Sequence, residues 1–127
     1  MTVARILLAE DEDALRGLIV RALAQEGHEV VAAADGAAAL DELTRDGGRF
    51  ELLLTDIRMP VMDGVALALA AARDHPDLTI VLMTGFADQR ERAHGLDALI
   101  HDVITKPFSI ADIKLAVGEA LAAKARR

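Results

Sequence analysis

The stretch LLLTDIRMPVMDG, residues 52–64, opens on an apolar run and passes through Asp56 into a segment with a proline and the pair Asp63-Gly64. An apolar run of this length, followed by residues that favour turns, is typical of a strand that helices cover on both faces. The stretch therefore predicts a buried strand over Leu52–Thr55 that delivers an aspartate at its carboxyl end.

The same unit, a short apolar run followed by a helical pattern, occurs five times along the chain. The expected strands are Val3–Ala9, Glu29–Ala33, Leu52–Thr55, Thr79–Thr84 and Asp102–Thr105. The expected helices are Asp13–Gln25, Ala37–Thr44, Val65–Asp74, Gln89–Leu99 and Ile110–Ala123, the last with Ser109 as its N-cap and Asp112 in its first turn. Regular strand–helix alternation predicts an α/β fold with a doubly wound, five-stranded parallel sheet.

Composition limits both the architecture and the function. The chain has 127 residues, of which 53% are hydrophobic, so we expect one domain over residues 1–127 with no output domain. A net charge of −7 and an aromatic content of 2% argue against a nucleic-acid partner. The absence of cysteine excludes disulfides and thiol chemistry, and no segment resembles a signal peptide or a membrane span. We expect a cytoplasmic protein without a membrane partner.

Polar residues stand at the carboxyl ends of four expected strands, where open parallel sheets bind their ligands. The first strand leads to Glu10 and Asp11, the third to Asp56, the fourth to Thr84 and the fifth to Lys106. Carboxylates held close together repel one another, and all-oxygen ligands favour Mg²⁺ as the neutralising ion. A carboxylate nucleophile beside Mg²⁺, a hydroxyl and an ammonium predicts a phosphoryl-acceptor site.

Each feature also has a simpler interpretation when it is taken alone. The acidic run Glu10–Asp13 fits a solvated helix start, Asp56 a turn cap, Thr84-Gly85 a turn and Lys106 a surface lysine. Their joint placement at strand ends favours the functional interpretation. The four histidines show no metal-like spacing and are interpreted as surface or loop residues: His28, His75, His94 and His101.

Four segments resemble the receiver domains of two-component signalling, the chemotaxis regulator CheY among them. They are LLAED (7–11), LTDIRMPVMDG (54–64), MTG (83–85) and TKPF (105–108), and together they extend over most of the chain. The resemblance implies strand order 2-1-3-4-5. It implies that Asp56 is phosphorylated, that Thr84 and Lys106 contact the phosphoryl group, and that the Lys106-Pro107 bond is cis. The implied Mg²⁺ ligands are Glu10, Asp11, Asp56 and the Arg58 main-chain carbonyl.

The same resemblance implies a protein that is not an enzyme, apart from its own phosphoryl transfer and autodephosphorylation. Its implied partners are a histidine kinase or histidine phosphotransfer protein and a downstream protein, recognised around the segment Asp88–Leu99 and the strand Asp102–Thr105. Val103 occupies a position where many receivers have an aromatic switch residue. Arg58 and Phe86 lead to the hypothesis that water attacks the phosphorylated form slowly.

The segments TGFA (84–87) and VITKPF (103–108) are similar to the CpdR regulators of alphaproteobacteria, single-domain receivers that control substrate delivery to the ClpXP protease. This similarity implies an adaptor with ClpX as its target. Two other classes stay open: a phosphate sink or relay intermediate, and a Mg²⁺-dependent phosphatase of similar fold. The phosphatase needs an acid/base carboxylate near the nucleophile, and Arg58 stands two residues after Asp56.

Overall fold

The computed structural model describes residues 3–45, 49–85 and 98–126, and its elements alternate between strand and helix. The strands are β1 (Arg5–Ala9), β2 (Glu29–Ala33), β3 (Leu52–Asp56), β4 (Thr79–Thr84) and β5 (Asp102–Thr105). The helices within the described ranges are α1 (Asp13–Gln25), α2 (Gly36–Thr44), α3 (Gly64–Asp74) and α5 (Ile110–Ala125). The helix expected over Gln89–Leu99 lies, apart from its last two residues, outside the described residues.

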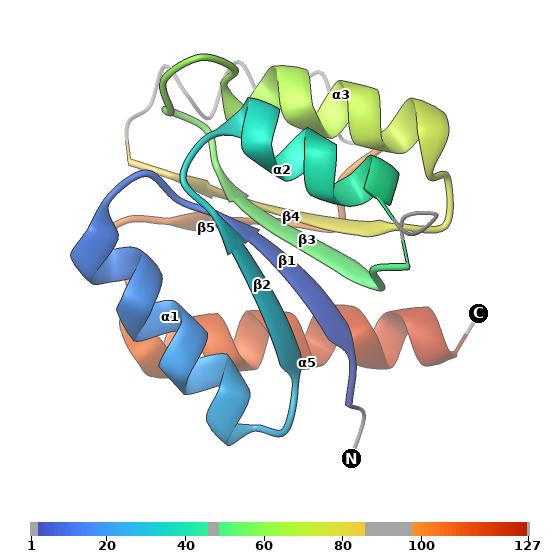
Figure 1. The fold of residues 1–127 in the computed structure, drawn as a ribbon. Coiled ribbons are helices and arrows are strands. Elements are labelled where there is room, and N and C mark those ends of the chain that lie inside the picture. Colours follow the sequence, from blue (N-terminus) through green and yellow to red (C-terminus); the bar gives the residue numbers. More distant parts are fainter. Residues whose placement is uncertain (1–2, 46–48, 86–97, 127) are drawn as a thin grey trace.

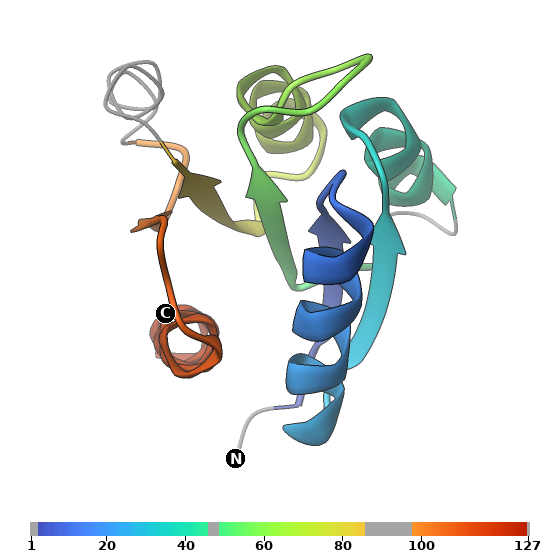
Figure 2. The ribbon, with the colours of Figure 1, turned by 90° about the vertical axis from the view of Figure 1, so that its left-hand side faces the viewer.

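The five strands form one parallel sheet in the order β2-β1-β3-β4-β5, which confirms the predicted order. Pairing runs from Arg5 opposite Glu29 at one edge to Thr84 opposite Thr105 at the other. Helices α2 and α3 cover one face of the sheet, and α1 and α5 cover the other (Figures 1 and 2). Since all strands point the same way, their carboxyl ends meet at a single edge of the sheet.

Each face of the sheet has its own apolar core. Along β1, Leu7 packs into the core beneath α2 and α3, while Ile6 and Leu8 pack into the core beneath α1 and α5. The centre of the sheet is buried completely, because every residue of β3 and β4 is buried. This double coverage explains why the strands read as continuous apolar runs rather than as alternating patterns.

The predicted bounds of α1, β2, β4 and β5 match the observed ones, and those of the other described elements differ by one or two residues. Strand β1 starts at Arg5 rather than Val3, because the register begins with the pair Arg5–Glu29 and Val3 is 61% exposed. Asp56 belongs to β3 rather than following it, since it pairs with Met83. The predicted cap of α5 is confirmed: the Ser109 side chain accepts from the Asp112 N–H, and the Asp112 carboxylate accepts from the Ser109 N–H.

Candidate functional site

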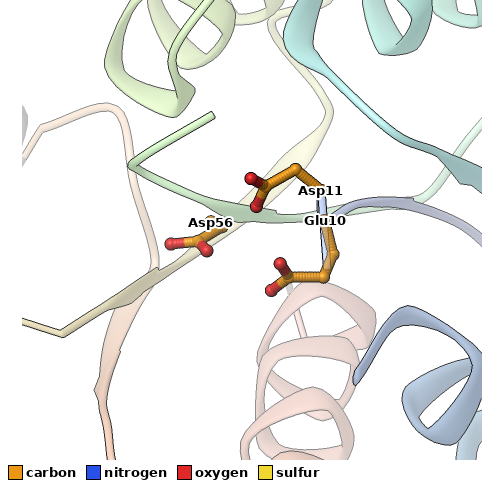
Figure 3. A group of neighbouring side chains, drawn as sticks. All are labelled: Glu10, Asp11 and Asp56. Atoms are coloured by element: carbon orange, nitrogen blue, oxygen red, sulfur yellow. The ribbon is translucent and has the colours of Figure 1, made fainter. Parts of the chain in front are cut away.

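Three carboxylates meet at the carboxyl edge of the sheet. Glu10 and Asp11 follow β1, Asp56 ends the neighbouring strand β3, and one oxygen from each lies within 4.8 Å of the others. Figure 3 shows the three side chains turned toward a shared space. Glu10 and Asp56 are almost fully buried, at 1% and 5% exposed, whereas Asp11 is open to solvent. The structure thus brings together the three side chains that the sequence assigned to a metal.

Lys106 completes the polar cluster from the other side. Its ammonium donates to Asp56 Oδ2 at 3.0 Å and lies 3.8 Å from Glu10 Oε1. The Lys106 side chain is 30% exposed, so the cation is shielded from water only in part. The Lys106-Pro107 peptide bond that follows β5 is cis, as the family resemblance implied.

Thr84 and Arg58 are the two remaining residues that the sequence assigns to the site. Thr84 is fully buried at the end of β4, and its carbonyl oxygen accepts a hydrogen bond from the Lys106 N–H at 2.7 Å. This bond ties the switch candidate Thr84 to the residue that carries the ammonium. Arg58 is exposed in the connection between β3 and α3, and its carbonyl as a metal ligand stays a prediction.

Burial and charge shift the ionisation of the cluster. Burial raises the pKa of Glu10 to about 7; the Glu12 N–H opposes the shift, the charge of Asp56 adds to it, and Lys106 opposes it. Burial lowers the pKa of Lys106, but its hydrogen bond to Asp56 and the negative charges of Asp56 and Glu10 outweigh this and raise it overall. The cluster therefore contains a firmly protonated ammonium beside a carboxyl group that ionises near neutral pH.

The residues present fit a hard divalent cation. Glu10 Oε1 is buried and has no hydrogen-bond partner within the described part of the chain, a costly arrangement unless another group satisfies it. With Asp11 and Asp56 it forms an all-oxygen donor set, which Mg²⁺ prefers. One ammonium does not balance three carboxylates, so a cation is also favoured on electrostatic grounds.

Arg16 and Gly64 support the site, and the sequence analysis did not identify either role. Arg16 on α1 donates through Nη1 to the Glu10 carbonyl oxygen at 2.9 Å. Gly64 packs so tightly that a Cβ there would lie 2.0 Å from the Asp56 carbonyl oxygen. The sequence signals were faint: an arginine on the polar side of a helix, and a glycine that also marks a turn.

Other predicted positions lie away from the cluster or outside the described residues. His28, His75 and His101 lie in connections between elements, as expected, whereas His94 is outside the described residues. Val103 is partly buried against the core beneath α2 and α3. Phe86, invoked with Arg58 for slow hydrolysis, is also outside the described residues. Within the described ranges, no helix has the length and apolarity needed to cross a membrane.

Comparison with known proteins agrees with this geometry. Residues 6–118 match the model of the response regulator receiver domain. The response regulator receiver protein CpdR of Brucella abortus is 41% identical over 109 residues, which cover 86% of this chain and 89% of that protein. The sensor kinase CckA of the same organism is 38% identical over 119 residues, which cover 93% of this chain and only 12% of CckA.

A solved structure shares the architecture over its whole length. The CheY-like receiver domain protein of Methanospirillum hungatei superposes with a TM-score of 0.88 at 28% identity and covers 98% of both chains. Phosphorylation and Mg²⁺ binding at an acidic pocket are general to receiver domains, which interact with histidine kinases and downstream targets and are generally not enzymes. By its family match, its relatives and its fold, the chain belongs to the response regulator receiver family.

Proposed function

We propose that this protein is a receiver that accepts a phosphoryl group on Asp56 in a Mg²⁺-dependent reaction. The observation that carries the proposal is the convergence of Glu10, Asp11, Asp56 and Lys106 at one edge of the sheet. Asp56 is central within this group, because it lies in the carboxylate cluster and also accepts the hydrogen bond from Lys106.

In the transfer step, an Asp56 carboxylate oxygen attacks the phosphorus of a phosphohistidine on the partner. A new O–P bond forms, and the P–N bond breaks with its electron pair returning to the imidazole nitrogen, which takes a proton from solvent. Lys106 then faces the added negative charge and donates to a phosphoryl oxygen rather than to the free carboxylate.

The residues that would hold Mg²⁺ are Glu10, Asp11 and Asp56, together with the Arg58 carbonyl. When bound, the ion supplies positive charge that offsets the phosphoryl oxygens during transfer. Glu10 has to release its proton to serve as a ligand, since its pKa is raised to about 7.

The signal leaves the site through β4 and β5. Thr84 is the residue expected to respond to the phosphoryl group. Its carbonyl oxygen accepts a hydrogen bond from the Lys106 N–H, so the ends of β4 and β5 are coupled. Displacement of Lys106 toward a phosphoryl oxygen would therefore be transmitted to β5, whose residue Asp102 is exposed. The partner surface expected at Asp88–Leu99 falls largely outside the described residues.

Intact mass spectrometry with acetyl phosphate as a small donor tests the proposal. The wild-type protein is expected to gain about 80 Da in the presence of Mg²⁺ and to gain nothing when the metal is chelated. Asp56→Asn, which preserves the shape of the side chain, is expected to show no gain. Asp77→Asn is the matched control, because Asp77 is exposed in the connection between α3 and β4 and lies outside the carboxylate cluster.

Phosphorylation of Asp56→Asn to the wild-type extent would show that another residue is the acceptor. A wild-type protein that stays unmodified by both acetyl phosphate and a phosphorylated histidine phosphotransfer protein would contradict the proposal as a whole.

As the downstream role, we infer a CpdR-like adaptor that delivers substrates to the ClpXP protease, with ClpX as the target. The support is the 41% identity to CpdR of Brucella abortus over most of both chains. Binding of immobilised ClpX by the unphosphorylated and the phosphorylated protein distinguishes the candidates. An adaptor binds ClpX in one phosphorylation state only, whereas a phosphate sink or relay intermediate binds it in neither.

A further inference from the structure

The turn that carries Glu10 and Asp11 is held by hydrogen bonds from three directions. The Glu10 N–H donates to the Ala33 carbonyl oxygen of β2 at 3.1 Å. The Glu12 N–H donates to Glu10 Oε2 at 3.0 Å, and the Arg16 guanidinium donates to the Glu10 carbonyl oxygen at 2.9 Å. Arg16 supplies the only one of these three bonds that comes from another side chain.

The bond from Arg16 acts on the peptide group between two candidate metal ligands. The carbonyl oxygen of Glu10 and the N–H of Asp11 belong to one planar unit, so fixing that oxygen fixes the plane. The directions in which the Glu10 and Asp11 side chains leave the backbone follow from the orientation of this plane. A single contact from α1 thus acts on two of the three carboxylates.

The guanidinium is itself held in place. Arg16 Nη2 forms an ion pair with Asp13, and the Arg16 side chain is 23% exposed. Asp13 is 90% exposed, so this ion pair contributes little stability by itself but fixes the direction of the planar guanidinium. One nitrogen is then available to the Glu10 carbonyl oxygen, in a geometry that an ammonium on a flexible stem does not reproduce.

We propose that Arg16 is a positioning residue for the Mg²⁺ site, which it organises by holding the Glu10–Asp11 peptide group. The inference rests on the proposed function, since it assigns a role in preparing the same site. Groups that orient metal ligands from outside typically change metal affinity about 10- to 100-fold when they are removed.

The direction in which Mg²⁺ affinity changes when Arg16 is removed distinguishes a positioning role from an effect of its charge. A cation near a metal site repels the metal, so removal of Arg16 would tighten Mg²⁺ binding if its charge were its only influence. A positioning role predicts the opposite result, weaker binding, despite the loss of a repelling charge. A purely structural role predicts lower stability without a change in affinity.

Isothermal titration of the metal-free protein with Mg²⁺ tests the proposal, with thermal unfolding followed by circular dichroism on the same samples. Arg16→Ala is expected to weaken Mg²⁺ binding by about 10-fold. Arg16→Lys keeps the charge and is expected to weaken binding too, since it lacks the planar fork. Arg21→Ala is the matched control: it removes an exposed arginine of the same helix and is expected to leave the affinity unchanged.

A second readout needs no metal. Hydrogen exchange at the Glu12 amide, which donates to Glu10 Oε2 in the intact turn, is expected to accelerate in Arg16→Ala and not in Arg21→Ala. Phosphorylation by acetyl phosphate is expected to approach the wild-type rate in Arg16→Ala when Mg²⁺ is saturating.

Unchanged or tighter Mg²⁺ binding by Arg16→Ala, beside a wild-type protein that binds Mg²⁺ and is phosphorylated, would overturn the inference and leave the proposed function standing. A wild-type protein that neither binds Mg²⁺ nor accepts phosphate would overturn both.

Discussion

Lys106 reaches Asp56 across the end of β4, the strand that separates β5 from β3, and its ammonium donates to the Asp56 carboxylate at 3.0 Å. The same ammonium lies 3.8 Å from Glu10 beyond β3. One cation thus bridges three of the five strands at the edge where the carboxylates gather. Through these two contacts, the Lys106 ammonium offsets the repulsion between the Glu10 and Asp56 carboxylates.

Replacement of Lys106 by methionine is expected to destabilise the metal-free protein at pH 8, because the buried Asp56 carboxylate loses its charged donor. We expect the free energy of unfolding in urea to fall by about 1.5–3 kcal/mol. The loss is expected to shrink when Mg²⁺ is added, since the metal takes over the neutralisation. An equal loss with and without Mg²⁺ would show that Lys106 acts through packing of its stem rather than through its charge.

The raised pKa of Glu10 makes stability depend on pH. In the folded protein the pKa of Glu10 is about 7, against an ordinary value of 4.5, so the folded state binds more protons than the unfolded state between these pH values. The contribution of Glu10 is therefore most favourable below pH 4.5 and is lost as the pH rises through about 7, by about 1.4 kcal/mol for each unit of difference. Glu10→Gln removes the ionisation.

Urea unfolding of both proteins in chelator, from pH 5 to pH 8, measures this effect. The stability of Glu10→Gln relative to wild type is expected to rise with pH and to level off above about pH 7. A stability difference that does not vary with pH would contradict a raised pKa. Mg²⁺ affinity of the wild type is expected to increase over the same interval, because the metal competes with a proton for Glu10.

Gly64→Ala is expected to be strongly destabilising, because the added Cβ would lie 2.0 Å from the Asp56 carbonyl oxygen, which belongs to the backbone of a buried strand. We expect a loss of more than about 3 kcal/mol, together with weaker phosphorylation as Asp56 is displaced. Gly118→Ala on α5 is the control. Its Cβ would meet nothing within 4 Å, and helix propensity predicts a gain of about 0.5–1 kcal/mol.

Val61→Asn is expected to stabilise the protein. Val61 has a φ of 70°, a left-handed conformation that is unfavourable for a β-branched residue, and its side chain is 83% exposed, so little packing is lost. Asparagine tolerates this conformation, and we expect a gain of about 1 kcal/mol in urea unfolding. Val3→Asn replaces another exposed valine, one without positive φ, and is expected to change stability by less than about 0.5 kcal/mol.

The strands of the sheet could be predicted from the sequence because the central strands are buried on both faces and are therefore almost entirely apolar. The apolar runs Leu52–Leu54 and Ile80–Met83 leave few alternatives to strands covered on both faces, and parallel pairing then brings their polar ends to one edge. Strand starts were harder to predict. Val3 is apolar enough for a strand, but pairing between β1 and β2 begins only at Arg5, opposite Glu29. Where β1 starts thus depends on where β2 starts, and the side chain of Val3 does not indicate it.

The contacts by which Arg16 and Gly64 support the site could not be predicted from the sequence. Sequence spacing places Arg16 on the polar side of α1, but its contact with the Glu10 carbonyl oxygen depends on the direction in which the helix leaves the turn. The role of Gly64 likewise depends on how closely the start of α3 approaches the backbone of β3. Both relationships are set by tertiary packing, which local pattern does not encode. The role of the Arg58 carbonyl stays a prediction.

The pairing of Lys106 with Asp56 joins residues 50 positions apart, and Glu10 comes from still earlier in the chain. A short fragment of the protein therefore contains at most part of the cluster, and the complete cluster forms only when the sheet brings these strand ends together. Phosphorylation by a small donor is therefore also a test of the folded state, because it requires side chains at the ends of β1, β3 and β5 to be brought together.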